Sequence, residues 1–65
     1  MQVTVNGETA EVARRCLADA LQDLGYGGMK VAVAVNMQFI PADQHGGHDL
    51  SEGDQIDVVA PMKGG

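Results

Sequence analysis

The sequence predicts an α+β domain in which a single helix packs across one face of a small mixed β-sheet. Two alternating segments at 2–5 and 8–12 flank an Asn-Gly pair, which is the strongest short signal for a β-hairpin. A helical stripe of apolar residues follows, and the second half holds three further short apolar segments typical of strands. One amphipathic helix over one sheet is the simplest way for so short a chain to bury these residues.

The N-terminal hairpin is expected to span residues 2–12. Asn6 and Gly7 both tolerate positive φ, so the chain can reverse direction there in two residues. The alternation then places Ala10 and Val12 on the inner face of the second strand.

The helix is predicted from apolar residues spaced i, i+3, i+4 and i+7, which are Leu17, Ala20, Leu21 and Leu24. Gly25 is expected to end it as the residue after the C-cap. The local charges are unfavourable, because Arg14 and Arg15 stand near the start and Asp23 near the end, against the helix dipole. We therefore expect tertiary packing to stabilise this helix.

The second half is expected to supply three strands separated by turns. The first strand is predicted at 31–35, followed by a turn at Asn36-Met37 and a short strand at 39–40 that Pro41 ends. One helical turn from Ala42 to His45 is expected next, broken by Gly46-Gly47. A turn at 52–54 then leads to the last strand at 55–60, with Ile56 and Val58 inward. The order β, β, α, β, β, β matches the ubiquitin-like β-grasp architecture. Residues 1–60 would form this domain, and 61–65 a flexible C-terminal tail ending in Gly-Gly.

Composition limits the function. Nine Asp plus Glu stand against four Lys plus Arg, a net charge of −5, which argues against nucleic acid as a partner. The longest apolar run, 31–35, is too short to cross a membrane, and no signal peptide is visible. The single Cys16 fits a reducing, cytoplasmic compartment. A chain of 65 residues leaves no room for a deep active site, so we expect it not to be an enzyme.

The end of the chain resembles a known family. The run Glu52-Gly53-Asp54-Gln55-Ile56-Asp57-Val58-Val59, followed by a short tail ending in Gly64-Gly65, is similar to the sulfur carriers of thiamine biosynthesis, the ThiS family. The middle of this chain resembles the middle of the same family. The matching residues are Val31-Ala32-Val33-Ala34-Val35-Asn36 and Ile40-Pro41, followed by His45 and Leu50. The residues are similar from 31 to 65. In the first half of the chain, only the order of the predicted elements is similar.

The resemblance implies a protein co-substrate whose working atom lies at its C-terminus. A ThiF-like adenylyltransferase would use ATP and Mg to adenylate the carboxylate of Gly65. Sulfur from a cysteine desulfurase would then convert it to a thiocarboxylate, which would donate sulfur to a thiazole synthase. ATP would bind the partner, so the chain itself is expected to hold no cofactor and no metal, and to be a monomer when free.

The tail composition suits this chemistry. The α-carboxyl of Gly65 is ionised at neutral pH, and a carboxylate must be activated before another nucleophile can replace its oxygen. Glycine has no Cβ, so Gly64 and Gly65 permit close approach of the backbone to a partner's catalytic groups. Pro61 is expected to stiffen the root of the tail, and Met62 and Lys63 to lengthen it. Lys63 could also meet acidic or phosphate groups of the partner.

A docking surface is predicted beside the tail. If Val31, Val33 and Val35 face the helix, then Ala32 and Ala34 face away from it. Val59 does so as well when Ile56 and Val58 point inward. These three outward residues would form a small exposed apolar patch, which is typical of a protein interface, although scattered surface apolar residues are also common.

Other functions share parts of this pattern. The small subunit of molybdopterin synthase uses the same terminal chemistry, and a ubiquitin-like modifier shares the acyl-adenylate. A small interaction domain with an accidental Gly-Gly end is the remaining alternative.

Three further signals are weak. Gly25-Tyr26-Gly27-Gly28 with Lys30 lacks the ending of a phosphate-binding loop. His45 and His48 lie across two glycines with no strong third ligand, so a polar surface loop is the better interpretation. Cys16 is interpreted as a packing residue of the helix.

Overall fold

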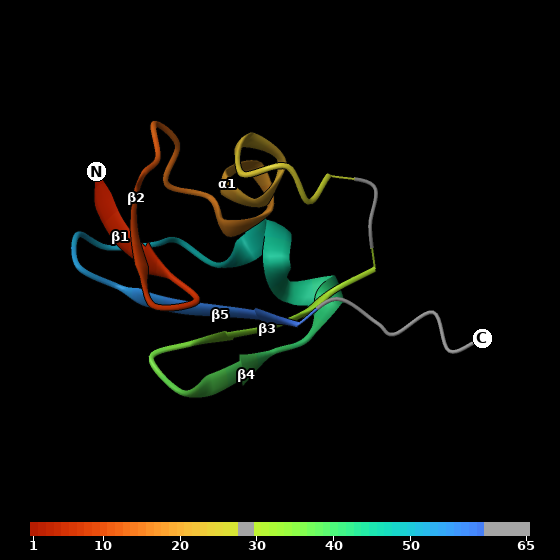
Figure 1. Ribbon diagram of the computed structural model, residues 1–65. Helices are drawn as coiled ribbons and strands as arrows, with labels where there is room; N and C mark the ends of the chain where they lie inside the picture. The colour runs from red at the N-terminus through yellow and green to blue at the C-terminus, as the bar shows by residue number, and fades with distance from the viewer. Residues whose placement is uncertain (28–29, 60–65) are drawn as a thin grey trace.

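The computed structural model describes residues 1–27 and 30–59 and shows one helix lying across a five-stranded sheet (Figure 1). The elements are, in order, β1 (Gln2–Val5), β2 (Glu8–Glu11), α1 (Leu17–Asp23), β3 (Ala32–Val35), β4 (Gln38–Ile40), the 3₁₀-helix η1 (Ala42–Gly47) and β5 (Gln55–Val59). The expected α+β class with a mixed sheet is confirmed.

The sheet has the strand order β2-β1-β5-β3-β4, so the last strand of the chain is the central one. β1 and β5 run parallel, with Val5 opposite Ile56, and the other neighbouring pairs are antiparallel. The central position of β5 matters for function, because the chain leaves the sheet from the end of this strand.

The core lies between α1 and one face of the sheet. Its buried apolar residues are Val3, Val12, Leu17, Ala20, Leu21, Val33, Val35, Ile40, Leu50, Ile56 and Val58. They come from α1, from the strands β1, β3, β4 and β5, and from the segments that hold Val12 and Leu50, in the alternating and helical spacings that the sequence contains. The helical stripe is confirmed, with Leu24 partly buried at its end. Within residues 1–27 and 30–59, no helix covers the opposite face of the sheet, and we call it the open face (Figure 1).

The turns and the helix end follow from residues that accept positive φ. Asn6 and Gly7 have φ of 51° and 85°, which allows the two-residue turn between β1 and β2. Gly25 has φ of 98° directly after the C-cap Leu24, so it ends α1 as expected.

The start of α1 is held by tertiary contacts. The Leu17 amide donates to the carbonyl of His48 at 2.9 Å, and the Leu50 amide donates to the carbonyl of Arg15 at 2.7 Å. Cys16 is therefore not a helix residue as expected; it is the N-cap, and its side chain makes no cap hydrogen bond. Backbone pairing with a distant loop replaces the missing capping side chain.

The unfavourable charges near α1 neutralise each other. Arg14 Nη2 lies 2.8 Å from Asp23 Oδ1, and its Nη1 lies 3.9 Å from Asp19 Oδ1. The hydrogen bond from Arg14 lowers the pKa of Asp23, and the same bond raises the pKa of Arg14. Both groups are exposed, so this pair orients the loop before α1 more than it stabilises the fold.

Some element boundaries differ from expectation. Gly46 and Gly47 do not break the helical turn after Pro41 but form the end of η1. Val31 lies outside β3, half-buried against the core. The last strand ends at Val59. Ala60 and the predicted tail 61–65 lie outside the described residues, as do Gly28 and Met29.

No helix within the described ranges is both long and apolar enough to cross a membrane.

Candidate protein-docking site

The central strand β5 delivers the chain to one end of the sheet. Its last residue, Val59, is 65% exposed, although the preceding residue Val58 is buried in the core. Residues 60–65 continue from this point. Val59 is therefore the last described residue before the C-terminal segment.

Two asparagines anchor β5. Asn6 Oδ1 accepts a hydrogen bond from the amide of Val58 at 2.8 Å, across from the turn between β1 and β2. Asn36 Oδ1 accepts from the amide of Gln55 at 3.0 Å, and its Nδ2 donates to Asp54 Oδ1 at 3.1 Å. Both ends of the strand are thus hydrogen-bonded to neighbouring turns, which holds β5 in place from Gln55 to Val58.

An apolar patch surrounds Val59 on the open face. Val59 pairs with Ala32 of β3, and Ala34 pairs with Phe39 of β4. All four side chains alternate with buried core residues and so point away from α1. Phe39 is 63% exposed, which is unusual for an aromatic side chain in a sheet. We call Ala32, Ala34, Phe39 and Val59 the open-face patch.

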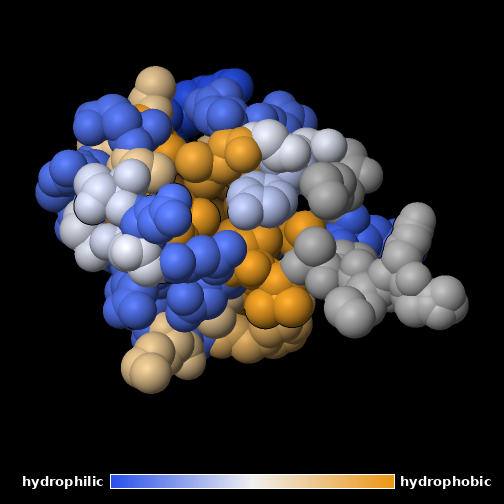
Figure 2. Space-filling view, in the orientation of Figure 1, coloured by the Kyte–Doolittle hydropathy of each residue, from blue (hydrophilic) through white to orange (hydrophobic). Residues whose placement is uncertain are grey.

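The patch continues into a groove at the same end of the domain. The groove has a volume of about 690 Å³, and its walls come from α1, the start of β3, η1 and the end of β5. Ala18 and Leu21 of the helix line it together with Val31, Phe39 and Val59. Figure 2 shows hydrophobic surface gathered across this face between regions of hydrophilic surface. An apolar area with a polar rim is typical of protein interfaces.

The structure brings together the predicted surface residues Ala32, Ala34 and Val59. Pro61, Met62, Lys63, Gly64 and Gly65 lie outside the described residues, so their predicted roles remain predictions. Sequence reasoning missed Phe39, the largest member of the patch. The alternation in β4 could have found it, since Ile40 points inward and its neighbour must then point outward.

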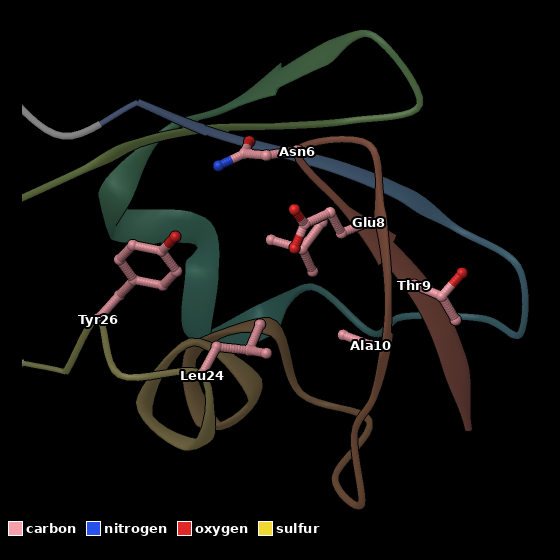
Figure 3. A pocket seen from close by; sticks show the side chains of 7 residues that line it. Asn6, Glu8, Thr9, Ala10, Leu24 and Tyr26 are labelled. Atoms are coloured by element: carbon pink, nitrogen blue, oxygen red, sulfur yellow. The ribbon is translucent and has the colours of Figure 1, made fainter.

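Two smaller hollows lie elsewhere. One, of about 350 Å³, lies between the β1–β2 hairpin and the end of α1, with Asn6, Glu8, Leu24 and Tyr26 among its lining residues (Figure 3). The other, of about 360 Å³, is lined by residues that include Met1, Arg15 and Asp49. Val59 lines neither of them, so the candidate docking site is the groove together with the open-face patch.

The weaker sequence signals have structural explanations. His45 Nε2 lies 3.0 Å from the carbonyl oxygen of Ile40, which places the ring against the end of β4. Cys16 Sγ lies 3.4 Å from the carbonyl oxygen of Gly46, a contact within hydrogen-bonding range for sulfur. Among residues 1–27 and 30–59, no cluster of three or more His, Cys, Asp or Glu could hold a metal ion.

A mixed five-stranded sheet with one helix across it, and a C-terminal segment leaving its central strand, define a ubiquitin-like β-grasp domain. The family follows from the sequence. A model of the ThiS family matches residues 3–65, and the chain therefore belongs to the ThiS family.

Two relatives are consistent with this assignment. The crystal structure of a thiamine biosynthesis protein (ThiS) from Geobacter metallireducens superposes with a TM-score of 0.83, at 25% identity, over 100% of both chains. A curated protein named thiazole synthase, from Paramagnetospirillum magneticum, is 30% identical over 66 residues. That match covers 100% of this chain but 20% of the relative, so the chain spans about a fifth of the relative's length.

Proposed function

We propose that this chain is the sulfur carrier for thiazole formation in thiamine biosynthesis. The carboxylate of Gly65 is the group that is converted to a thiocarboxylate and so carries the sulfur. The main support is that the family match runs to the last residue and so includes Gly64 and Gly65. The similarity to a protein named thiazole synthase supports the pathway, and the exposed patch around Val59 supports a role in which another protein holds the domain.

The first step activates the carboxylate. An oxygen of the Gly65 carboxylate attacks the α-phosphorus of ATP, pyrophosphate leaves, and an acyl-adenylate forms. Magnesium and the groups that bind ATP belong to a ThiF-like adenylyltransferase. This chain contributes the nucleophilic carboxylate and two residues without side chains, so that the end of the chain fits a narrow site.

The second step exchanges oxygen for sulfur. The persulfide supplied ultimately by a cysteine desulfurase attacks the acyl carbon with its outer sulfur, AMP leaves, and an acyl disulfide forms. A thiol of the partner enzyme then attacks the donor-side sulfur, so that the S–S bond breaks, a new disulfide forms on the partner side, and the sulfur stays on the acyl carbon of Gly65. The product is a thiocarboxylate, whose sulfur is more nucleophilic than the oxygen it replaced. Thiazole synthase then transfers this sulfur to its substrate, and an oxygen atom of that substrate or of water replaces it on the acyl carbon, so the carrier returns to its carboxylate form.

In this scheme the carrier is a protein substrate and not a catalyst. The rigid domain gives each partner a surface to bind, and the tail gives it a reactive end. Because the partners use the same tail, they must bind the same end of the domain in turn. ATP, Mg and a reducing environment point to the cytoplasm as the place of reaction.

Intact-mass analysis tests the proposal. The full chain is incubated with a ThiF-like adenylyltransferase, MgATP, a cysteine desulfurase and cysteine. We expect a mass increase that corresponds to one oxygen replaced by sulfur, located at Gly65 by fragmentation. A variant lacking Gly64 and Gly65 is the matched control and should not change.

Three results would contradict the proposal. The first is the absence of any ATP-dependent change at Gly65. The second is a ladder of conjugates on lysines of other proteins, which would indicate a ubiquitin-like modifier. The third is a lasting complex with the large subunit of molybdopterin synthase, which would indicate the other carrier family.

A further inference from the structure

A single carboxylate lies inside the open-face patch. Asp57 is on the central strand β5, directly opposite Ala34, which in turn pairs with Phe39. Val59 lies two residues further along β5 on the same face. Asp57 is half-buried, so apolar neighbours already cover part of it.

This carboxylate takes no part in the polar contacts of the fold. Within residues 1–27 and 30–59, it appears in none of the ion pairs and none of the side-chain hydrogen bonds. Several other acids of the described residues do make such contacts. Asp23 binds Arg14, and Asp54 accepts hydrogen bonds from Asn36 Nδ2 and the Ser51 amide. Asp is also among the residues least favoured in strands, so the fold gains little from Asp57.

Docking changes the environment of Asp57. A protein that covers Val59, Ala34 and Phe39 must also cover the carboxylate between them and remove its remaining water. A purely apolar partner surface would leave a buried, unpaired charge, which is strongly unfavourable. A partner surface with a cationic donor at this point would instead form a shielded, charge-assisted hydrogen bond.

We propose that the open-face patch binds a partner surface made of apolar side chains around one arginine, and that this arginine pairs with Asp57. Arginine fits better than lysine, because its planar guanidinium is weakly hydrated, binds carboxylates with two hydrogen bonds and stacks on aromatic rings such as Phe39. The excess of acidic residues, nine against four basic ones, favours the approach of a basic surface.

The occupant is the thiazole synthase of the same organism. This rests on the proposed function and on one comparison: a segment similar to the whole of this chain forms part of a protein named thiazole synthase. The carrier must bind thiazole synthase and later dissociate from it. An interface with one strong contact at its centre and weak contacts around it meets both requirements. Asp57 is thus a specificity residue of the carrier.

The test compares two isosteric charge removals in the full chain. Asp57→Asn removes the charge inside the patch, and Asp49→Asn removes one exposed charge near the start of α1, away from the patch. The dissociation constant for thiazole synthase is measured by calorimetry at two salt concentrations. We expect Asp57→Asn to weaken binding by ~30-fold or more and Asp49→Asn by less than ~3-fold.

A second variant separates charge from shape. Asp57→Glu keeps the carboxylate and should retain most of the affinity that Asp57→Asn loses. Circular dichroism melts of all three variants confirm that the domain is folded. Equal or tighter binding by Asp57→Asn would overturn the inference, because it would mean that the carboxylate stays in water in the complex.

The outcome is distinguishable from failure of the proposed function. Thiocarboxylate formation on the wild-type chain tests the function alone. If the wild type acquires sulfur but Asp57→Asn binds thiazole synthase normally, the inference fails and the function stands. If Asp57→Asn impairs only adenylation, thiazole synthase is the wrong occupant and the inference is overturned.

Discussion

Val59→Asp tests whether the end of β5 is the docking site. Val59 is 65% exposed, so about two thirds of its surface is available for burial by a partner. Full burial of a valine side chain contributes ~1.5–3 kcal/mol, and two thirds of this is ~1–2 kcal/mol. The new carboxylate would also lie on the same face as Asp57 and would lose water without a partner, which adds ~1–3 kcal/mol.

The sum is ~2–5 kcal/mol, which corresponds to a loss of affinity of ~30-fold or more. The cost to the fold is smaller, ~1 kcal/mol, because the side chain is exposed and stands at the last position of the strand. The assay is pyrophosphate release by the adenylyltransferase as a function of carrier concentration. We expect kcat/KM to fall by at least ~30-fold, with circular dichroism and the cooperative melt retained.

Met37→Asp is the matched control. Met37 is 86% exposed and lies in the turn between β3 and β4, at the other end of the sheet from Val59 (Figure 1). It makes the same change, from an exposed apolar side chain to a carboxylate, and should leave kcat/KM within about 3-fold of wild type. Equal kcat/KM for Val59→Asp and wild type would refute the assignment of the docking site. Equal losses in both variants would show a general charge effect instead.

Three further changes test the fold. Asn6→Gly keeps the positive φ but removes the acceptor for the Val58 amide, and should lower the free energy of unfolding by ~1–2 kcal/mol in urea titrations; Asn6→Asp, which keeps an acceptor, should not. Leu17→Ala creates a cavity at a fully buried site and should cost ~2–5 kcal/mol, enough to broaden or abolish the cooperative melt. Asp23→Asn removes a carboxylate whose pKa Arg14 lowers in the folded state. That stabilisation is present above the unfolded pKa of 3.8 and is lost as the pH falls through the folded pKa. The variant should therefore melt at a lower temperature than wild type at neutral pH, and at the same temperature in strong acid. A difference in melting temperature that persists in acid would contradict this.

The local elements could be predicted because their signals are local. Asn6-Gly7 needs only its own backbone preferences to make a turn, and Gly25 needs only positive φ to end a helix. The spacing of Leu17, Ala20 and Leu21 selects one helical face without reference to the rest of the chain.

The predictions for the start of α1 and for the end of η1 were wrong because contacts with a distant segment determine the structure there. No capping side chain marks the start of α1, because residues 15–17 pair through their backbone with residues 48–50. The glycines at 46 and 47 continue η1, although glycine disfavours helices, since η1 lies against the start of α1 through contacts such as Cys16 Sγ to the carbonyl oxygen of Gly46.

The sequence by itself determined the family, the element types and the composition of the C-terminal segment, because these depend on residue identity and short-range spacing. Only the tertiary structure decided that Phe39 and Asp57 lie beside the predicted docking residues. Asp57, Ala34 and Phe39 come from three strands and meet because β5 is inserted between β1 and β3 in one register. That register is set by burial of the opposite face of the sheet against α1, an effect of the whole core that no single segment contains.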